Sequence, residues 1–412
     1  MRNLFDQYEQ PENRLSHARA VCLNEDRTLL RGFLAWVGIR SSAPATKLLI
    51  AEQTLPGDAP ESGERAERQG LPDIIIHDDA AWCVLIESKV QAALTDDQLA
   101  RHERTLRRRG FEVVERMVLT KAGVRPRRVI ARTWSSLYEW LGNSATRSEW
   151  SERLRAYLRA AEVRLAREGY LTEGTLTMFD GFQFSADNPY PYGEGKRLLK
   201  LAMTELRQDR SLQALGMDPA APGRGAITGR GEGAVWDFLS LVDRPKRATF
   251  TSYPHLTLSV QADHLDVAIT IPNGVTQPAR QRLIDLGAEG LISLNAQILT
   301  RARRILALGG WVEAYALQRH YRSQRSPTTT DARMAFKLET SQPGGSGRVK
   351  GQTEWVELFA ELFRRKRANI QFGYVVHLPW DTKGLNSRTS LRLIADSWRA
   401  MQPLLDTVRG EP

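Results

Sequence analysis

Apolar residues in the first third of the chain recur with two spacings, which predict alternating helices and strands. Runs of Ile, Val and Leu at 71–76 and 82–90 flank the short polar segment 77–81, a pattern that predicts a β-hairpin. Apolar positions three or four residues apart predict a helix that begins near Pro11, and Thr95 can cap another. Further elements are expected as strands at 47–55, 113–120 and 126–131 and a helix at 134–141. This order predicts an α/β fold, with a mixed sheet flanked by helices.

The rest of the chain predicts two further parts. Residues 146–235 are typical of a connector with helices at 148–169 and 196–215, an aromatic segment at 178–193 and a Gly-rich loop at 219–233. Residues 236–412 predict an α+β domain with a hairpin at 257–272, a long helix at 278–308, strands at 312–319, 333–338 and 370–378, and helices at 354–367 and 387–405. The predicted domains are therefore 1–145, 146–235 and 236–412.

Three charged residues lie within the apolar hairpin, where an unpaired charge is costly: Asp73, Glu87 and Lys89. If the turn centres near Ala80, Asp73 lies opposite Glu87, and Lys89 shares the face of Glu87 because it is two residues further along the strand. Two adjacent carboxylates favour Mg²⁺ or Mn²⁺ between them, and a neighbouring lysine can orient or deprotonate a water. The trio indicates hydrolysis of phosphodiesters, and the alternative is a surface hairpin whose charges face solvent.

Residues in the flanking helices add to this pattern. Glu12 projects from the first turn of the first helix, while Gln98 and His102 share one face of the helix after the hairpin. Glu12 and Gln98 each have a simpler explanation. A glutamate is favourable at a helix N-terminus, and Gln98 also suits a solvated position on its helix. His102 is expected to be a half-buried histidine with satisfied hydrogen bonds, because no second His or Cys stands near it at ligand spacing.

Taken together, Pro72-Asp73, Glu87-Ser88-Lys89, the helical Glu12 and Gln98 make residues 1–145 resemble the PD-(D/E)XK nuclease superfamily, which has the restriction-endonuclease-like fold. The resemblance implies that Glu12, Asp73 and Glu87 bind one or two Mg²⁺ ions, that Lys89 is the water-positioning base, and that Gln98 contacts the site or the substrate. Related nucleases carry a tyrosine four residues after the glutamine, where this chain has His102. The resemblance also implies a DNA substrate and a role like that of bacterial nucleases that defend against phage.

The charge distribution bears on how a nucleic acid would be held. The chain carries +10 overall, of which residues 1–145 contribute 21 basic minus 20 acidic residues, or +1, and the remainder contributes 37 minus 28, or +9. Arg101, Arg104 and Arg108 recur at helical spacing after the hairpin and are expected to contact phosphates. Other basic clusters lie at 301–304, 319–325 and 364–367. The alternative for each is a favourable interaction with a helix C-terminus.

Composition excludes several classes of protein. The 42% hydrophobic and 26% charged content is ordinary for a globular protein, and no apolar run of membrane-spanning length or signal-peptide core occurs, so a cytoplasmic protein without a membrane partner is expected. Only Cys22 and Cys83 occur, so neither disulfides nor a zinc site are indicated.

No catalytic constellation is expected in 236–412, which we interpret as a recognition, regulatory or dimerisation domain, so a homodimer is one expectation. Three alternatives to a defence nuclease stay open. They are a repair or recombination nuclease, a nucleic-acid-binding protein that keeps the fold without cleavage, and a ligand-sensing protein.

Overall fold

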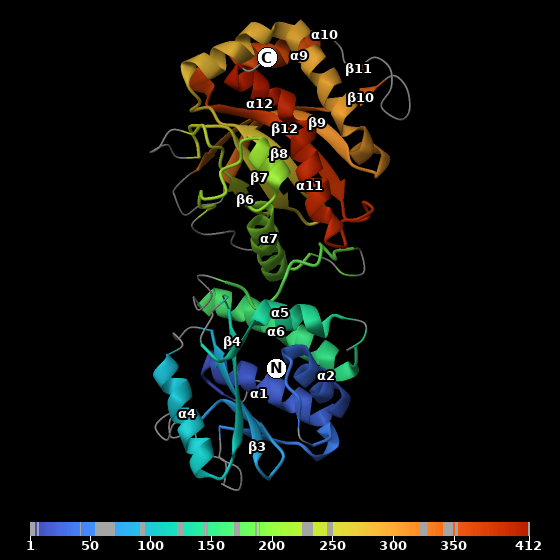
Figure 1. The fold of residues 1–412 in the computed structure, drawn as a ribbon. Helices are drawn as coiled ribbons and strands as arrows, with labels where there is room; N and C mark the ends of the chain where they lie inside the picture. Colours follow the sequence, from blue (N-terminus) through green and yellow to red (C-terminus); the bar gives the residue numbers. More distant parts are fainter. Residues whose placement is uncertain are drawn as a thin grey trace. The chain divides into compact units, whose positions relative to one another are not determined.

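The protein folds into two compact units, residues 1–178 and 179–412 (Figure 1). The computed structural model describes residues 5, 8–41, 43–53, 71–90, 95–121, 123, 127–143, 145, 147–168, 174–185, 188, 190–224, 234–244, 250–321, 328–340, 349–350 and 353–410. The expected connector 146–235 is divided between the units, because its first helix packs with the N-terminal unit and its later elements join the core of the C-terminal unit. The boundary between the two compact units lies near residue 178, whereas the sequence predicts domain boundaries at 145 and 235.

The N-terminal unit is built on a five-stranded mixed sheet in the order β1-β2-β3-β4-β5. The first three strands are antiparallel neighbours, and β3, β4 and β5 are parallel. Their bounds are β1 Leu49–Glu52, β2 Ile74–His77, β3 Trp82–Lys89, β4 Val113–Thr120 and β5 Ile130–Thr133. The predicted mixed sheet and hairpin are confirmed.

Helices cover both faces of this sheet, and each face has its own core. One core holds alternate hairpin residues such as Ile74 and Ile86, and the other holds Ile75 and Leu85. Because both faces are buried, these strands have nearly continuous apolar runs. The first face packs on α1 Pro11–Glu25, α2 Arg27–Val37, α5 Trp134–Leu141 and α6 Glu149–Glu168, and the second on α4 Asp96–Arg108.

The C-terminal unit contains a seven-stranded antiparallel sheet in the order β11-β10-β9-β12-β8-β7-β6. Its strands are β6 Val235–Leu239, β7 His255–Val260, β8 His264–Ile271, β9 Trp311–Tyr321, β10 Thr328–Thr340, β11 Val349–Lys350 and β12 Ile370–Pro379. The predicted hairpin and the three predicted strands are present. The edge strands β6 and β11 were not expected from the sequence.

Helices pack on one face of this second sheet, and Figure 1 shows α9, α11 and α12 lying against it. The helices are α7 Tyr192–Leu206, α8 Arg210–Ala214, α9 Gln277–Ala307, α10 Thr353–Leu362, α11 Thr389–Ala400 and α12 Gln402–Arg409. The predicted helix 387–405 is two helices, and the one predicted at 354–367 ends at Leu362. On the opposite face, a small apolar cluster of strand residues surrounds Tyr315.

The part of the chain that the structure describes contains no helix with the length and apolar character required to cross a membrane. The segment after residue 178 contributes Phe179 and Phe182 to the core of the C-terminal unit, where both are fully buried. This placement fits an aromatic segment that packs within a domain.

The lack of a side chain at Gly373 lets strands β12 and β8 approach each other closely at the centre of the second sheet. A Cβ at this position in β12 would lie 2.1 Å from the carbonyl oxygen of Ile269 on β8, so the Gly373→Ala variant must push two backbones apart. We expect a loss of about 1–3 kcal/mol, as for other overpacked cores. Thermal denaturation followed by circular dichroism measures it. Gly123→Ala is the control, because nothing lies within 4 Å of its added Cβ, and equal melting of the two variants would contradict the prediction.

Candidate active site

The register of the hairpin β2–β3 brings the predicted trio to one end of the sheet. Ile74 pairs with Ile86, and continuing this register by one residue sets Asp73 opposite Glu87. Since Leu85 faces α4, Glu87 and Lys89 lie on that same face. Ser88 points to the other face, where it accepts a hydrogen bond of 2.8 Å from the Ser16 hydroxyl on α1. The predicted alternation of these side chains is therefore what the strand adopts.

Glu87 is almost fully buried, with 2% of its side chain exposed. The Lys89 Nζ lies 2.6 Å from Glu87 Oε1, and the Gln98 amide on α4 donates to the same oxygen at 2.6 Å. Glu87 Oε2 lies 3.4 Å from the His102 Nε2. Gln98 and His102, four residues apart, thus point at one carboxylate, which the sequence did not indicate for the histidine.

These contacts set the charges of the pair. Burial alone would raise the pKa of Glu87, but the His102 imidazole and the Lys89 ammonium hold this pKa below its ordinary value. Burial alone would lower the pKa of Lys89, but the Glu87 carboxylate raises it. Both effects favour the ion pair, so Lys89 is an ammonium ion in this state of the protein.

Asp73 has the opposite electrostatic character. Burial, followed by the nearby Glu87 charge, raises the pKa of Asp73 well above its ordinary value, although the Ser88 N–H, Lys89 and Arg19 oppose the shift. Its Oδ2 accepts a hydrogen bond of 2.7 Å from the Ser88 N–H. Ionised Asp73 is therefore unfavourable unless further positive charge is present.

Glu12 reaches the same end of the sheet from the first turn of α1. Its Oε1 accepts a hydrogen bond of 3.2 Å from the Val90 N–H, and its charge contributes to the raised pKa of Lys89. Glu12, Asp73 and Glu87 are not among the described residues whose ligand atoms group closely enough to hold a metal ion. Among the described residues one group of His, Cys, Asp and Glu meets this condition, and it lies in the C-terminal unit.

Arg19 is a residue of the site that the sequence analysis missed. It lies on the buried face of α1 with its side chain fully covered, and its Nη2 donates to the Ser88 hydroxyl at 3.1 Å. Burial lowers the pKa of the Arg19 guanidinium to about 10, while the Asp73 and Glu52 charges oppose this shift. Its position four residues after Leu15 and three before Cys22 was the available signal, because it puts a charge on an apolar face.

Two backbone features hold the strand ends in place. The Trp134 indole donates to the carbonyl of Lys89 at 3.3 Å, and the Gln53 N–H donates to that of Asp73 at 3.1 Å. Gln53 has a positive φ of 47°, a conformation that costs free energy for a residue with a side chain. Residues 54–70, which follow Gln53, lie outside the described residues.

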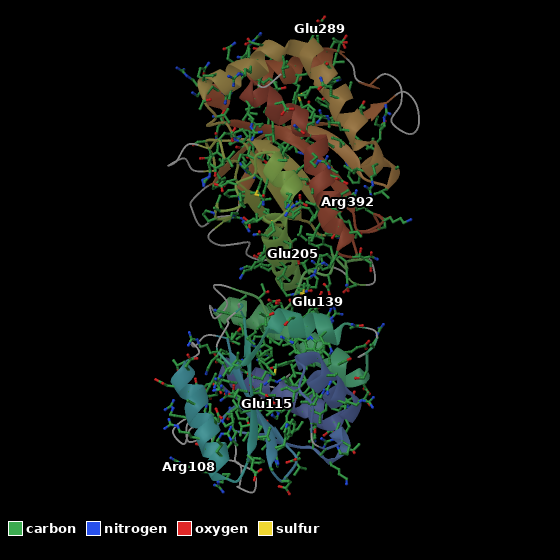
Figure 2. All side chains as sticks on the ribbon, viewed as in Figure 1. Arg108, Glu115, Glu139, Glu205, Glu289 and Arg392 are labelled. Atoms are coloured by element: carbon green, nitrogen blue, oxygen red, sulfur yellow. The ribbon has the colours of Figure 1, made fainter. Side chains whose placement is uncertain are left out.

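The predicted phosphate-binding arginines lie on the solvent side of α4. Arg101, Arg104 and Arg108 are exposed, whereas Leu99, His102 and Leu106 are buried on the opposite side. Arg108 is ten residues beyond Gln98 and so lies about 15 Å further along the helix axis; Figure 2 shows it at one end of α4. Contact with phosphates stays a prediction, and it suits Arg101 and Arg104 better than Arg108.

The donor atoms of the site fit a hard divalent cation. Asp73 and Glu87 supply carboxylate oxygens, the ligands that Mg²⁺ prefers. Glu87 Oε2 is buried, with the His102 Nε2 at 3.4 Å. The Lys89 ammonium already supplies positive charge beside the two acids. A divalent metal ion would therefore share the carboxylate oxygens with this ammonium or displace it.

The raised pKa of Asp73 predicts a stability effect. In the folded protein Asp73 binds its proton more tightly than in the unfolded chain, so stability falls as the pH rises through the raised pKa. Asp73→Asn keeps an oxygen for the Ser88 N–H and removes the charge. We therefore expect a higher melting temperature than wild type in EDTA near neutral pH, and no difference below the ordinary carboxyl pKa.

Circular dichroism across a pH series measures this difference. Asp79→Asn is the matched control, because Asp79 is exposed in the hairpin turn and its positive φ of 59° suits asparagine. A neutral-pH melting temperature of Asp73→Asn at or below that of wild type would contradict the assignment.

Comparison with known proteins adds no relative to this description. No family model matches the chain, and no curated protein or solved structure matches it either. The functional conclusion therefore depends on the residues and geometry of this chain.

Proposed function

We propose that the N-terminal unit hydrolyses phosphodiester bonds of nucleic acid, most readily DNA, in a Mg²⁺-dependent reaction. The observation that carries the proposal is the grouping of Asp73, Glu87 and Lys89 on one sheet face, with Lys89 Nζ 2.6 Å from Glu87. A purely structural ion pair would not require Asp73, whose ionised form is disfavoured there. Two close carboxylates and a lysine match the needs of this chemistry.

Asp73 and Glu87 would hold the cation, with Glu12 as a further candidate ligand. When bound, Mg²⁺ polarises the phosphoryl oxygen and stabilises the charge that grows on it. Neutralising the two carboxylates removes the charges that raise the pKa of Lys89. The pKa of Lys89 would then fall, and after its ammonium proton has passed to solvent the neutral amine would orient the attacking water and accept its proton.

Gln98 and His102 act as positioning residues in this mechanism. The Gln98 amide fixes one oxygen of Glu87, and the His102 ring lies beside the other. Both residues belong to α4, so the docking of one helix sets the orientation of the carboxylate. The tyrosine that related nucleases carry is replaced by His102, which also presents a donor.

The proposal predicts loss of metal-dependent cleavage in two variants. Asp73→Asn removes a metal ligand while keeping its shape, and Lys89→Met removes the charge while keeping most of the stem. We expect each to lower the cleavage rate by about 100-fold or more, the scale of general acid–base catalysis. Supercoiled plasmid, linear duplex, single strands and RNA, each with Mg²⁺, Mn²⁺ or EDTA, provide the assay.

Asp79→Asn is again the matched control and should cleave as wild type does. Wild-type cleavage that persists in EDTA, or full activity of both site variants, would refute the mechanism. A strong preference for ends or branched DNA in the same assay would favour repair over defence.

The arginines of α4 predict how salt affects binding. In the Asp73→Asn background, Arg101→Ala combined with Arg104→Ala should weaken duplex binding. The two substitutions should also reduce the slope of log affinity against log salt concentration by about 0.9 for each phosphate that the protein no longer neutralises. Fluorescence anisotropy at several salt concentrations measures the slope. Arg31→Ala is the control, because Arg31 is exposed on α2. A slope unchanged from that control would show that these arginines do not contact phosphates.

A further inference from the structure

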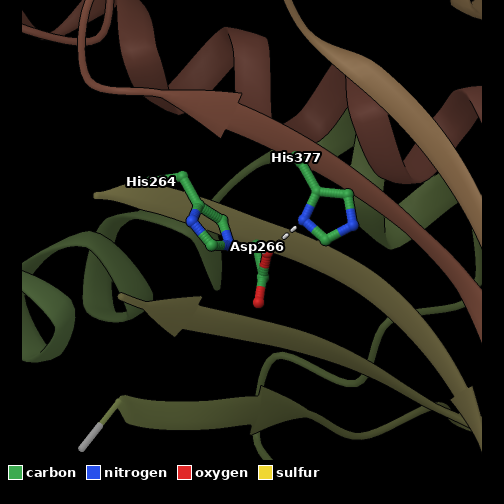
Figure 3. Close-up of side chains that lie close together, drawn as sticks. All are labelled: His264, Asp266 and His377. Carbon is green, nitrogen blue, oxygen red and sulfur yellow. Dashed lines mark hydrogen bonds and ion pairs between the residues drawn. The ribbon is translucent and has the colours of Figure 1, made fainter. Parts of the chain in front are cut away.

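The C-terminal unit contains a second group of ionisable side chains, on the sheet face opposite the helices. Leu265 and Val267 of β8 face the helical core, so His264 and Asp266 point to the other face. His377 of β12 lies directly across from Asp266 in the sheet. Figure 3 shows these three side chains pointing toward one another. The sequence analysis did not anticipate this group of ionisable side chains.

The distances within this group are close to those between ligands of one metal ion. Asp266 Oδ1 lies 2.9 Å from His264 Nε2 and 2.7 Å from His377 Nδ1, and one ligand atom from each of the three lies within 4.8 Å of the others. Two ligands about 2.0–2.2 Å from a metal, at angles between 90° and 110°, are roughly 2.9–3.5 Å apart. The two oxygen–nitrogen distances are therefore close to this range, and the distance between the two histidine nitrogens lies within 4.8 Å.

The surroundings of the three side chains also fit a metal site. Metal-binding histidines commonly direct their second nitrogen at a carboxylate. His264 Nδ1 lies 2.6 Å from Asp263 Oδ1, and His377 Nε2 lies 3.9 Å from Glu313 Oε1. The second oxygen of Asp266 accepts a hydrogen bond of 2.9 Å from the Gln261 amide. The outer atoms of His264 and Asp266 thus have partners within hydrogen-bond distance, and the outer nitrogen of His377 has a carboxylate nearby.

His377 distinguishes this group from an ordinary hydrogen-bonded network. Its Nε2 is buried and has no hydrogen-bond partner among the described residues. Coordination through Nδ1 would fix the proton on Nε2 and direct it at Glu313. The Trp311 ring stacks on His377 at 4.9 Å between centroids and so fixes the plane of the imidazole.

We propose that His264, Asp266 and His377 bind a first-row divalent transition metal, with Zn²⁺ as the first candidate. Two imidazole nitrogens and one carboxylate oxygen suit Zn²⁺ and its neighbours, whereas Mg²⁺ prefers oxygen alone. Three protein ligands leave at least one coordination position for water or a small ligand. The site is separate from the acidic site of the N-terminal unit and does not depend on the function proposed for it.

Metal binding by the full chain tests the proposal. After treatment with EDTA and its removal, the protein is titrated with ZnCl₂ by calorimetry and with CoCl₂ by visible absorption. We expect one bound ion per chain at this site, not displaced by excess MgCl₂. His377→Ala and Asp266→Asn should weaken binding about 100-fold or more, and Asp263→Asn about 10–100-fold, as for partners outside the ligand set.

Two controls keep the outcome interpretable. His320→Ala should bind as wild type does, because His320 pairs with Asp331 at 2.7 Å on the exposed surface of the same sheet, outside the group of three. Asp73→Asn should also bind as wild type does. Circular dichroism confirms that Asp266→Asn, the least disruptive change, is folded. The proposal fails if wild type binds neither Zn²⁺ nor Co²⁺, or if folded Asp266→Asn and His377→Ala bind as tightly as wild type.

Discussion

The arrangement of the N-terminal unit depends on the burial of one carboxylate, that of Glu87. An ionised group taken out of water costs several kcal/mol unless other groups compensate it. Lys89, Gln98 and His102 supply that compensation, and two of these three belong to α4. The charge of Glu87 therefore fixes where α4 docks as well as how the carboxylate points. Hydrophobic packing through Leu99 and Leu106 holds the helix against the sheet but does not select this orientation by itself.

The end of β3 is restrained from both faces of the sheet. On the face opposite α4, Ser88 accepts hydrogen bonds from Ser16 and Arg19 of α1, and the carbonyl of Lys89 accepts one from Trp134. On the α4 side, the Ser88 N–H donates to Asp73. Every residue from 87 to 90 is thus tied to another part of the unit, since Val90 donates to Glu12 of α1. A site that must hold charges close together without collapsing needs such preorganisation.

Local patterns in the sequence predicted the parts of the site that local rules govern. The hairpin, its register and the shared face of Glu87 and Lys89 follow from apolar runs and the alternation of side chains along a strand. The spacing of Arg19 puts a charge on the apolar face of α1, but its partner Ser88 follows only from the packing of α1 against the sheet. The site in the C-terminal unit was missed for a similar reason. His264 and Asp266 stand two apart, but His377 joins them through pairing of β12 with β8, across more than 100 residues of chain.

The two sites share a method of construction and differ in donor chemistry. Each uses two polar residues two apart on one strand, Glu87 with Lys89 and His264 with Asp266, and a third from the adjacent strand. A neighbouring strand is the nearest rigid element, so it can deliver a side chain to within a few ångströms without a long loop. The first set offers oxygen ligands beside an ammonium, and the second offers two imidazoles with one carboxylate. Hard cations favour the oxygen ligands of the first set, and cations of borderline hardness favour the imidazoles of the second. The two proposed sites would therefore bind different ions when both kinds are present.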